Sequence, residues 1–232
     1  MWDAETVGLF MDAAKNSRFH HLYHLAVLTG MRRSELAGLK WENVDLLSGR
    51  LSIVNTLQRI PGYGLVESTP KTARSRRNIA LKAVAVKSLH SIRGRQIEER
   101  EVAGTAWQNT DYVFAQADGT PVDPESITRD FRAIVDRSGL PYLTLNGLRH
   151  AHATLALAAG VNPKIVSERL GHSTIAITMD TYSHVLPGMQ EEAAQAVEDL
   201  LEEAEYRRLE RNLIGQNGHE MVTNSLESGN TK

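Results

Sequence analysis

Apolar residues recur at helical spacing over most of the chain. Asp3 is a typical N-cap residue, and the apolar positions that follow it at Val7, Phe10, Met11 and Ala14 predict a first helix. A second apolar run over residues 19–28 stops at Gly30, and the segment MRRSELAGLKW predicts a short helix that ends near Gly38. Further helices are expected at residues 82–102, 124–138, 146–159, 163–170, 173–182 and 189–213.

The periodicity changes between Val44 and Asn55, where short apolar stretches flank the turn Ser48-Gly49-Arg50. This pattern predicts a β-hairpin. A third strand is expected at residues 77–81, after the loop IPGYGLVESTPKTARS. The sequence therefore predicts a mainly α fold with a small three-stranded antiparallel β-sheet, an α+β class.

The C-terminal part of the chain differs from the rest. Its last predicted helix carries one apolar stripe, so we expect it to dock against another surface; the stripe comprises Ala193, Val197, Leu200, Leu201 and Ala204. Residues 215–232 are rich in Gly, Asn, Ser and Thr, which predicts disorder. We therefore expect a main domain at residues 1–186, a helix at 187–214 and a disordered tail at 215–232.

Composition excludes several classes of site. The 232 residues include 26 Lys+Arg, 28 Asp+Glu and no Cys, with a formal net charge of −2. The absence of Cys excludes thiolate zinc sites, Fe–S clusters, thiol catalysis and disulfides. No apolar run is long enough to cross a bilayer, and the first residues lack the features of a signal peptide. We expect a cytoplasmic protein without a membrane partner.

Charge is distributed unevenly. Residues 188–210 carry eight acids against two bases, whereas residues 68–97 carry no acid. The eight bases of that second segment are Lys71, Arg74, Arg76, Arg77, Lys82, Lys87, Arg93 and Arg95. The basic segment is suited to a polyanion, although two solvated helix faces of opposite sign would give the same pattern.

Four segments carry candidate chemistry: TGMRRSEL (29–36), TPKTARSRR (69–77), LNGLRHAHAT (145–154) and LGHSTIAITMDTYSHV (170–185). Each has a structural explanation when taken alone, such as a surface salt bridge, a solvated lysine or a half-buried tyrosine. In combination and in this order they resemble the catalytic domain of the tyrosine recombinases, the phage-integrase family of DNA breaking and rejoining enzymes. The resemblance extends over roughly residues 1–205.

The resemblance implies a role for each matching residue. The two family arginines match Arg32 and Arg149, the accompanying acid matches Glu35, the hairpin lysine matches Lys71, the second His or Trp matches His172, and the nucleophile matches Tyr182. By resemblance, Tyr182 becomes linked to a 3′ phosphate, Lys71 protonates the leaving 5′ oxygen, His172 hydrogen-bonds the phosphate and Glu35 orients the bases of the site.

One position departs from the family pattern. Asn146 stands where the family most often has His or Lys, and an amide can donate a hydrogen bond but cannot carry a proton. We expect Asn146 to hydrogen-bond the phosphate. His150 follows the second arginine, where the family commonly has a histidine, and we interpret it as structural support.

The residue types suit phosphodiester chemistry independently of the resemblance. Two guanidiniums can give charge-assisted hydrogen bonds to the nonbridging oxygens of a phosphate under attack. Tyrosine is a suitable covalent nucleophile because phenolate is a better leaving group than an alkoxide, so the strand can be resealed. Neither Cys nor a cluster of carboxylates is available for a two-metal site, and we expect no metal or cofactor.

Two further groups of residues are candidates for binding an ion or a phosphate. His20 and His24 lie one helical turn apart with His21 between them, but no carboxylate or third ligand is evident, and we favour a surface pair. The basic segment is interpreted as a set of phosphate contacts beside the hairpin, assigned to Arg74, Arg76, Arg77 and Lys82.

The resemblance also implies partners. We expect double-stranded DNA, a homotetramer on two DNA sites and, in some reactions, accessory DNA-bending proteins, in a bacterial cell or nucleoid as a phage or mobile-element protein. Members of the family usually carry an N-terminal DNA-binding domain, and by resemblance we expect this sequence to start after it, as either an excised fragment or a short member. Two alternatives remain: a DNA-binding relic or regulator with an impaired site, and a metal-dependent hydrolase that uses the histidines.

Overall fold

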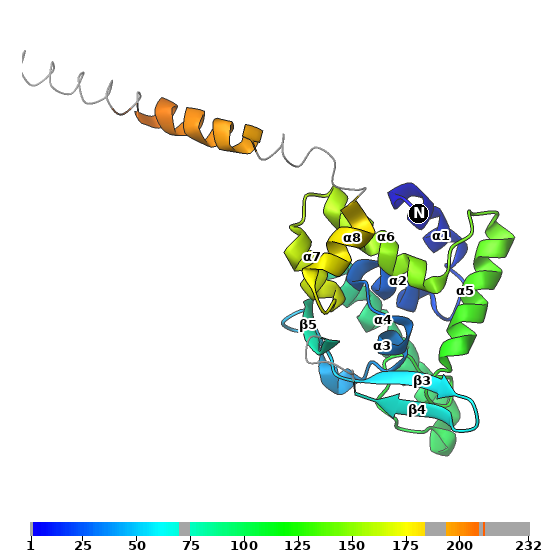
Figure 1. Cartoon of the computed structure of the whole chain (residues 1–232). Helices are drawn as coiled ribbons and strands as arrows, with labels where there is room; N and C mark the ends of the chain where they lie inside the picture. Colours follow the sequence, from blue (N-terminus) through cyan, green and yellow to red (C-terminus); the bar gives the residue numbers. More distant parts are fainter. Residues whose placement is uncertain (1, 70–74, 184–193, 209–210, 212–232) are drawn as a thin grey trace, which may run out of the picture. The chain divides into compact units, whose positions relative to one another are not determined.

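The computed structural model describes residues 2–69, 75–183, 194–208 and 211, and the chain divides into two units, Met1–Val185 and Leu186–Lys232. The first unit is mainly helical with small antiparallel sheets, which confirms the predicted fold class (Figure 1). Its helices are α1 (Ala4–Ala13), α2 (His20–Thr29), α3 (Arg33–Ala37), α4 (Ala83–Ala103), α5 (Pro124–Ser138), α6 (Leu145–Ala158), α7 (Pro163–Leu170) and α8 (Ile175–Tyr182), with 3-10 turns η1 (Trp41–Asn43) and η3 (Gly104–Ala106).

The helix boundaries follow the local signals in the sequence. The Asp3 side chain accepts a hydrogen bond from the Thr6 backbone N–H at 2.8 Å, so α1 begins with the predicted cap. Gly30 ends α2 in the left-handed conformation, with φ of 66°. A Cβ at Gly30 would lie 2.6 Å from a methyl carbon of Leu170 and 2.7 Å from the ring of His152. Glycine is therefore required there both by the backbone and by the packing of α2 against its neighbours.

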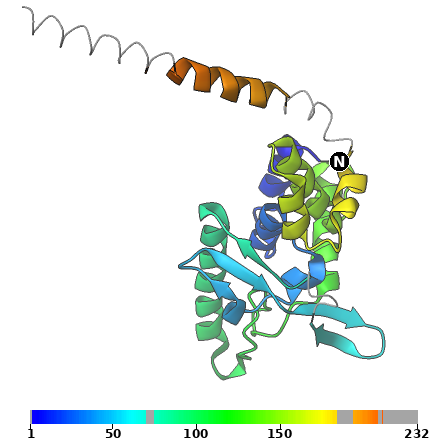
Figure 2. The same ribbon diagram turned by 60° about the vertical axis from the view of Figure 1, so that its left-hand side comes forward.

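Two antiparallel sheets lie in this unit. β1 (Val44–Asp45), β2 (Arg50–Ile53) and β5 (Arg77–Ala80) form the predicted three-stranded sheet in the order β1-β2-β5, with Leu51 opposite Ile79. Residues 60–75 were expected to be a loop, but Gly64–Ser68 form β4, which pairs with β3 (Thr56–Ile60) in a hairpin. Figure 2 shows the strands beside α4 at one end of the unit and α6, α7 and α8 grouped at the other.

The core is centred on α2. Phe10 of α1, Tyr23 of α2 and Phe131 of α5 are almost fully buried, and the Phe10 ring centroid lies 4.7 Å from that of Phe131 and 5.3 Å from that of Tyr23. α2 also packs against α4 and α6. Because α2 leads directly into Gly30 and Arg32, this packing fixes the position of the first candidate arginine.

The second unit is described at residues 194–208, which are helical and lie within the helix predicted at 189–213. Three side chains of its predicted stripe are exposed, namely Val197, Leu200 and Leu201 at 58%, 66% and 65%. The predicted tail at 215–232 lies outside the described residues. In the described part of the chain, none of the helices combines the length and apolar character that a membrane crossing requires.

Candidate active site

Arg32 lies at the start of α3 and is held by Glu35. The Glu35 carboxylate accepts one hydrogen bond from the Arg32 backbone N–H at 2.8 Å and another from its guanidinium at 2.9 Å. The side chain of Glu35 is 2% exposed, whereas that of Arg32 is 39% exposed. Glu35 therefore holds one terminal nitrogen of Arg32, the other lies 3.5 Å from the Gly171 carbonyl, and the side chain stays partly accessible.

The same carboxylate pairs with Arg77 at the start of β5. Both terminal nitrogens of Arg77 donate to Glu35, at 3.0 and 2.9 Å, and its Nε donates to the Arg169 carbonyl at 2.6 Å. Burial alone would raise the pKa of Glu35, but the hydrogen bonds and charges of Arg77 and Arg32 outweigh it and lower that pKa. Glu35 is therefore ionised and binds two arginines.

This ion pair corrects one sequence prediction. Arg77 was assigned to phosphate contact, but its side chain is 7% exposed and its donors are engaged by Glu35 and backbone carbonyls. Arg76 and Lys82, which flank β5, are exposed. Arg74 lies outside the described residues, as does Lys71.

Arg149 projects from α6 into the same region. Its two terminal nitrogens donate to the carbonyls of Gly30 and Leu170, each at 2.7 Å, and only 6% of the residue is exposed. Burial and the charge of Arg32 lower the pKa of Arg149 to about 9, so the guanidinium remains charged at neutral pH. Arg149 thus ties the end of α2 to the end of α7.

Tyr182, the last residue of α8, is 1% exposed, and its hydroxyl lies 2.8 Å from Nδ1 of His150. The other ring nitrogen of His150 lies 3.3 Å from the amide nitrogen of Asn146, one turn earlier on α6. Burial raises the pKa of Tyr182, although Arg149 opposes this, and burial together with Arg149 lowers the pKa of His150. At neutral pH both groups are uncharged.

The contact between His150 and Tyr182 was missed from the sequence, which gave His150 a structural role. The two residues are separated by 32 positions and meet because α7 packs against both α6 and α8. No local pattern indicates this contact; the sequence places only Asn146 and His150 on one helix face, four residues apart.

His172 follows Gly171, the C-cap of α7. Its Nδ1 lies 2.8 Å from the buried hydroxyl of Thr178. Burial, followed by the charges of Arg149 and Arg32, lowers the pKa of His172 to about 4. With Thr178 donating to Nδ1, the neutral ring keeps a proton on Nε2 that it can donate.

Several of the candidate residues line one cavity of about 390 Å³. Six of its lining residues were predicted from the sequence: Arg32, Asn146, Arg149, His150, His172 and Tyr182. Ser75, just after the segment that contains Lys71, also lines it. Two charged guanidiniums, a neutral imidazole donor and a phenol thus face one space, which is a suitable arrangement for a tetrahedral anion beside an oxygen nucleophile.

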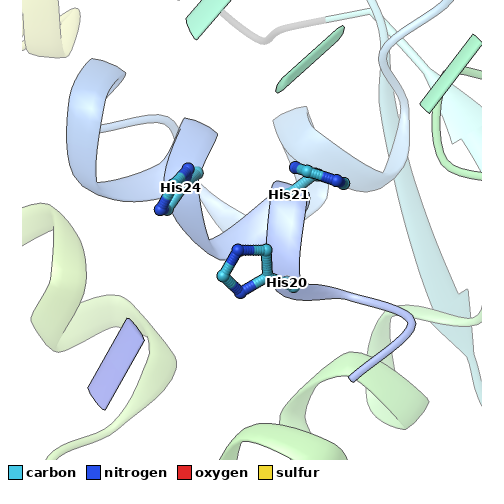
Figure 3. Close-up of side chains that lie close together, drawn as sticks. All are labelled: His20, His21 and His24. Atoms are coloured by element: carbon cyan, nitrogen blue, oxygen red, sulfur yellow. The ribbon is translucent and has the colours of Figure 1, made fainter. Parts of the chain in front are cut away.

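The three histidines at the start of α2 lie apart from this cavity. His20, His21 and His24 are each partly buried, and Figure 3 shows them close together on one turn of α2. His21 thus provides the third ring that was not evident from the sequence. One ring nitrogen from each lies within 4.8 Å of the other two, which makes them a possible metal-binding group.

Comparison with known proteins identifies the family of this chain. The family model described as "Phage integrase family" matches residues 2–189. The chain belongs to the phage integrase family. It is 33% identical over 207 residues to a protein named tyrosine recombinase XerC-like from Caldanaerobacter subterraneus subsp. tengcongensis, covering 84% of this chain and 53% of the relative. It is 30% identical over 183 residues to the ICEBs1 integrase of Bacillus subtilis, covering 79% and 49%.

This integrase-family chain spans about half the length of these curated relatives. Among solved structures it resembles the Tn1549 transposon integrase in complex with circular intermediate DNA, with a TM-score of 0.70, 20% identity and coverage of 84% of this chain and 66% of that one. It also resembles XerA recombinase, with a TM-score of 0.64, 23% identity and coverage of 84% and 64%. These similarities show that the fold is shared.

Proposed function

We propose that this chain carries the catalytic domain of a site-specific recombinase that cleaves and rejoins DNA without a metal ion. Tyr182 attacks a backbone phosphate, a 3′-phosphotyrosine forms, the bond to the 5′ oxygen breaks, and a DNA hydroxyl later reverses the step. The observation that carries this proposal is the shared cavity, in which the Tyr182 hydroxyl lies with Arg32, Arg149 and His172. Family membership supports it.

The arginines bind the phosphate in this scheme. Arg149 donates two N–H groups to the Gly30 and Leu170 carbonyls. A guanidinium has five N–H groups, so three remain for the substrate. Arg32 is partly exposed on the same cavity. Planar guanidiniums bind nonbridging phosphate oxygens with directed, charge-assisted hydrogen bonds, and they stabilise the charge that develops in the transition state.

His150 takes the proton of the nucleophile. The raised pKa of Tyr182 means that its proton has to leave as the new bond to phosphorus forms, and neutral His150 lies 2.8 Å away. In the tautomer that accepts this proton on Nδ1, Nε2–H is held by the amide of Asn146, turned so that its oxygen accepts. Asn146 then orients the base instead of acting as one.

Lys71 is assigned the remaining proton transfer. It protonates the 5′ oxygen as that oxygen leaves, so the atoms balance: the proton of Tyr182 passes to His150 and a separate proton comes from Lys71. The residues that flank its segment support the assignment, because Thr69 and Ser75 line a second cavity together with Arg32. Arg76 and Lys82 remain exposed for DNA backbone contacts.

The nucleophile is tested by Tyr182→Phe. With a suicide DNA substrate and no divalent metal, the unaltered chain should form a covalent protein–DNA adduct, and the variant should form none because it lacks the attacking oxygen. Its fold should be retained at a cost of about 1 kcal/mol for the lost hydrogen bond. The measurement is the adduct band on a denaturing gel.

Tyr142→Phe is the matched control, since Tyr142 is 73% exposed and the same atom is removed. An adduct that persists in Tyr182→Phe rejects the nucleophile. A native chain that binds DNA but never forms an adduct, even when joined to an N-terminal DNA-binding domain, favours the relic or regulator.

The proposed substrate is double-stranded DNA, bound by a homotetramer across two sites, with accessory DNA-bending proteins in some reactions. The exposed apolar residues at 197, 200 and 201 support docking of the C-terminal helix on a neighbouring subunit. Deletion of residues 187–232 should spare binding to a single site and reduce pairing of two sites, measured by native gel shift. Full pairing by the truncated chain would contradict docking in trans.

A further inference from the structure

The histidines at the start of α2 form a cluster that the proposed reaction does not use. The ring centroid of His20 lies 5.2 Å from that of His21 and 4.8 Å from that of His24, and the outer two are 6.4 Å apart. Figure 3 shows His20 between the other two on one turn of the helix. His24 lies four positions after His20 and three after His21, the two spacings at which side chains are neighbours on a helix surface, so the helix brings both rings near His24.

In the described part of the chain, two ring nitrogens of this cluster lack the partners that buried polar atoms normally have. Nδ1 of His20 and Nδ1 of His21 are buried and have no hydrogen-bond partner among the described residues. Nδ1 of His24 lies 3.2 Å from the hydroxyl oxygen of Ser88 on α4. Two buried nitrogens are thus unsatisfied, and the third ring is oriented by a neighbouring hydroxyl.

We propose that His20, His21 and His24 bind a divalent transition-metal ion of the zinc type. In this arrangement His24 donates Nδ1–H to Ser88 and coordinates through Nε2, the usual pairing of a metal-bound imidazole with an outer acceptor. Coordination at about 2.0–2.1 Å places two nitrogens roughly 3.4 Å apart in a tetrahedral site. In the proposed site the ligand atoms, now within 4.8 Å of one another, move closer by rotation of the rings.

The donor set and its surroundings define the kind of ion. Three neutral imidazoles suit zinc, nickel or copper, whereas magnesium and calcium prefer oxygen ligands. The nearby cation Arg95 has Glu99 as a counterion, with 3.8 Å between Nε and the carboxylate.

A metal ion at this site would stabilise helix α2 and would take no part in DNA cleavage. Phe19, the N-cap residue of α2, provides no side-chain hydrogen bond in the described structure, so the first turn begins without a cap. An ion that joins residues 20 and 24 would fix that turn. The C-terminal end of α2 carries the Gly30 carbonyl to which Arg149 is bound, so the ion would stabilise the helix that positions the arginines.

Zinc titration of the metal-free full chain tests the site. Isothermal titration calorimetry at pH 7.5 should show one zinc ion per chain, and zinc should raise the thermal unfolding midpoint. The double variant His20→Gln/His24→Gln should weaken this binding by about 10- to 100-fold or more. His90→Gln, an exposed histidine on α4, is the matched control and should bind as the unaltered chain does.

A second measurement does not depend on whether the variant folds. Ring-nitrogen NMR spectra of the unaltered chain should show zinc-dependent shifts for His20, His21 and His24 at one equivalent, with the His150 and His172 rings unchanged. Shifts confined to other histidines, absence of binding, or equal affinity in the double variant would each overturn the proposal. Because DNA cleavage is not a readout, these outcomes are independent of the proposed recombinase activity.

Discussion

The candidate active site has two parts that carry similar charges in different surroundings. In the buried part, Glu35, Arg77 and Arg149 are 2–7% exposed and bonded to one another or to backbone carbonyls. In the accessible part, Arg32 is 39% exposed and Asn146 is exposed. The buried residues, called the frame below, fix the geometry of the site. The exposed residues Arg32 and Asn146, called the edge, keep polar groups available to the substrate.

The balance of charge between these parts explains the affinity proposed for a polyanion. Three guanidiniums share the single carboxylate of Glu35, since Arg32 and Arg77 bind it directly and its charge also acts on Arg149. With the histidines neutral, the group keeps a charge of +2 (three minus one). A buried positive group that faces a cavity raises the local concentration of anions and contributes to their stabilisation.

The largest effect is expected for Arg149→Ala, which damages both parts. The cleavage rate should fall about 10²- to 10³-fold through loss of a phosphate donor. The free energy of unfolding should also fall by about 2–3 kcal/mol, because the Gly30 and Leu170 carbonyls lose their partner. Single-turnover cleavage and urea unfolding measure the two effects.

Arg32→Ala should lower the cleavage rate as Arg149→Ala does, but with little loss of stability. Arg32 binds the same phosphate in the proposal, but Glu35 keeps its bond to Arg77 without it. The rate should fall by a similar factor while stability changes by less than about 1 kcal/mol. If both variants lose equal stability, the separation into frame and edge is wrong.

Glu35→Gln should have the next largest effect, and mainly on stability. Removing the negative charge leaves Arg77 buried without a counterion, which should lower the free energy of unfolding by about 3 kcal/mol or more. Since the pKa of Glu35 is lowered, its stabilisation is complete at neutral pH and is lost as pH falls through its folded-state pKa. Urea unfolding at pH 7 and pH 3 measures both points.

The control for charge alone is Glu98→Gln, at an exposed position of α4. Adding Arg77→Met to Glu35→Gln should recover part of the lost stability, because the unpaired cation is then gone. Additive losses in that double variant would show that the pair contributes little to the frame.

Local signals in the sequence were enough for most of the helices. Asp3 caps α1, and α5 begins at the proline and ends at the serine that were predicted, because the cap, the apolar period and Gly139 agree. The predicted catalytic residues that the structure describes also meet in one cavity. That prediction came from the order of the four motifs, which matches the family. Local patterns could not have given it, because residues so far apart in sequence meet only in the folded chain.

The features that were missed depend on tertiary contacts or weak patterns. The β3–β4 hairpin lacks clear alternation: β3 has two buried residues followed by three exposed ones. Arg77 is in a basic run, and only its pairing with Glu35, 42 residues away, shows that it is buried. The bond between His150 and Tyr182 likewise joins two helices that no local rule brings together.

The smallest of these effects is expected at His150, where substitution tests whether the residue is a general base or only a positional contact. If His150 is the base, His150→Gln should lower the cleavage rate by about 10²-fold at pH 7, near the lower end for general-base catalysis, with little loss of stability. Gln can still hydrogen-bond but cannot accept the proton. The removal of a base and the removal of a purely positional contact therefore differ in their dependence on pH.

Burial, followed by the charge of Arg149, lowers the pKa of His150 below its usual value of 6.5. The native rate should therefore be constant at neutral pH and should fall as pH drops through that lowered pKa, where the ring gains a proton. In His150→Gln this acid limb should vanish, whereas His172→Gln, the control within the same cavity, should keep it. Single-turnover rates from pH 4.5 to pH 8 decide the matter. If the acid limb survives in His150→Gln, His150 has only a structural role and another group accepts the proton of Tyr182.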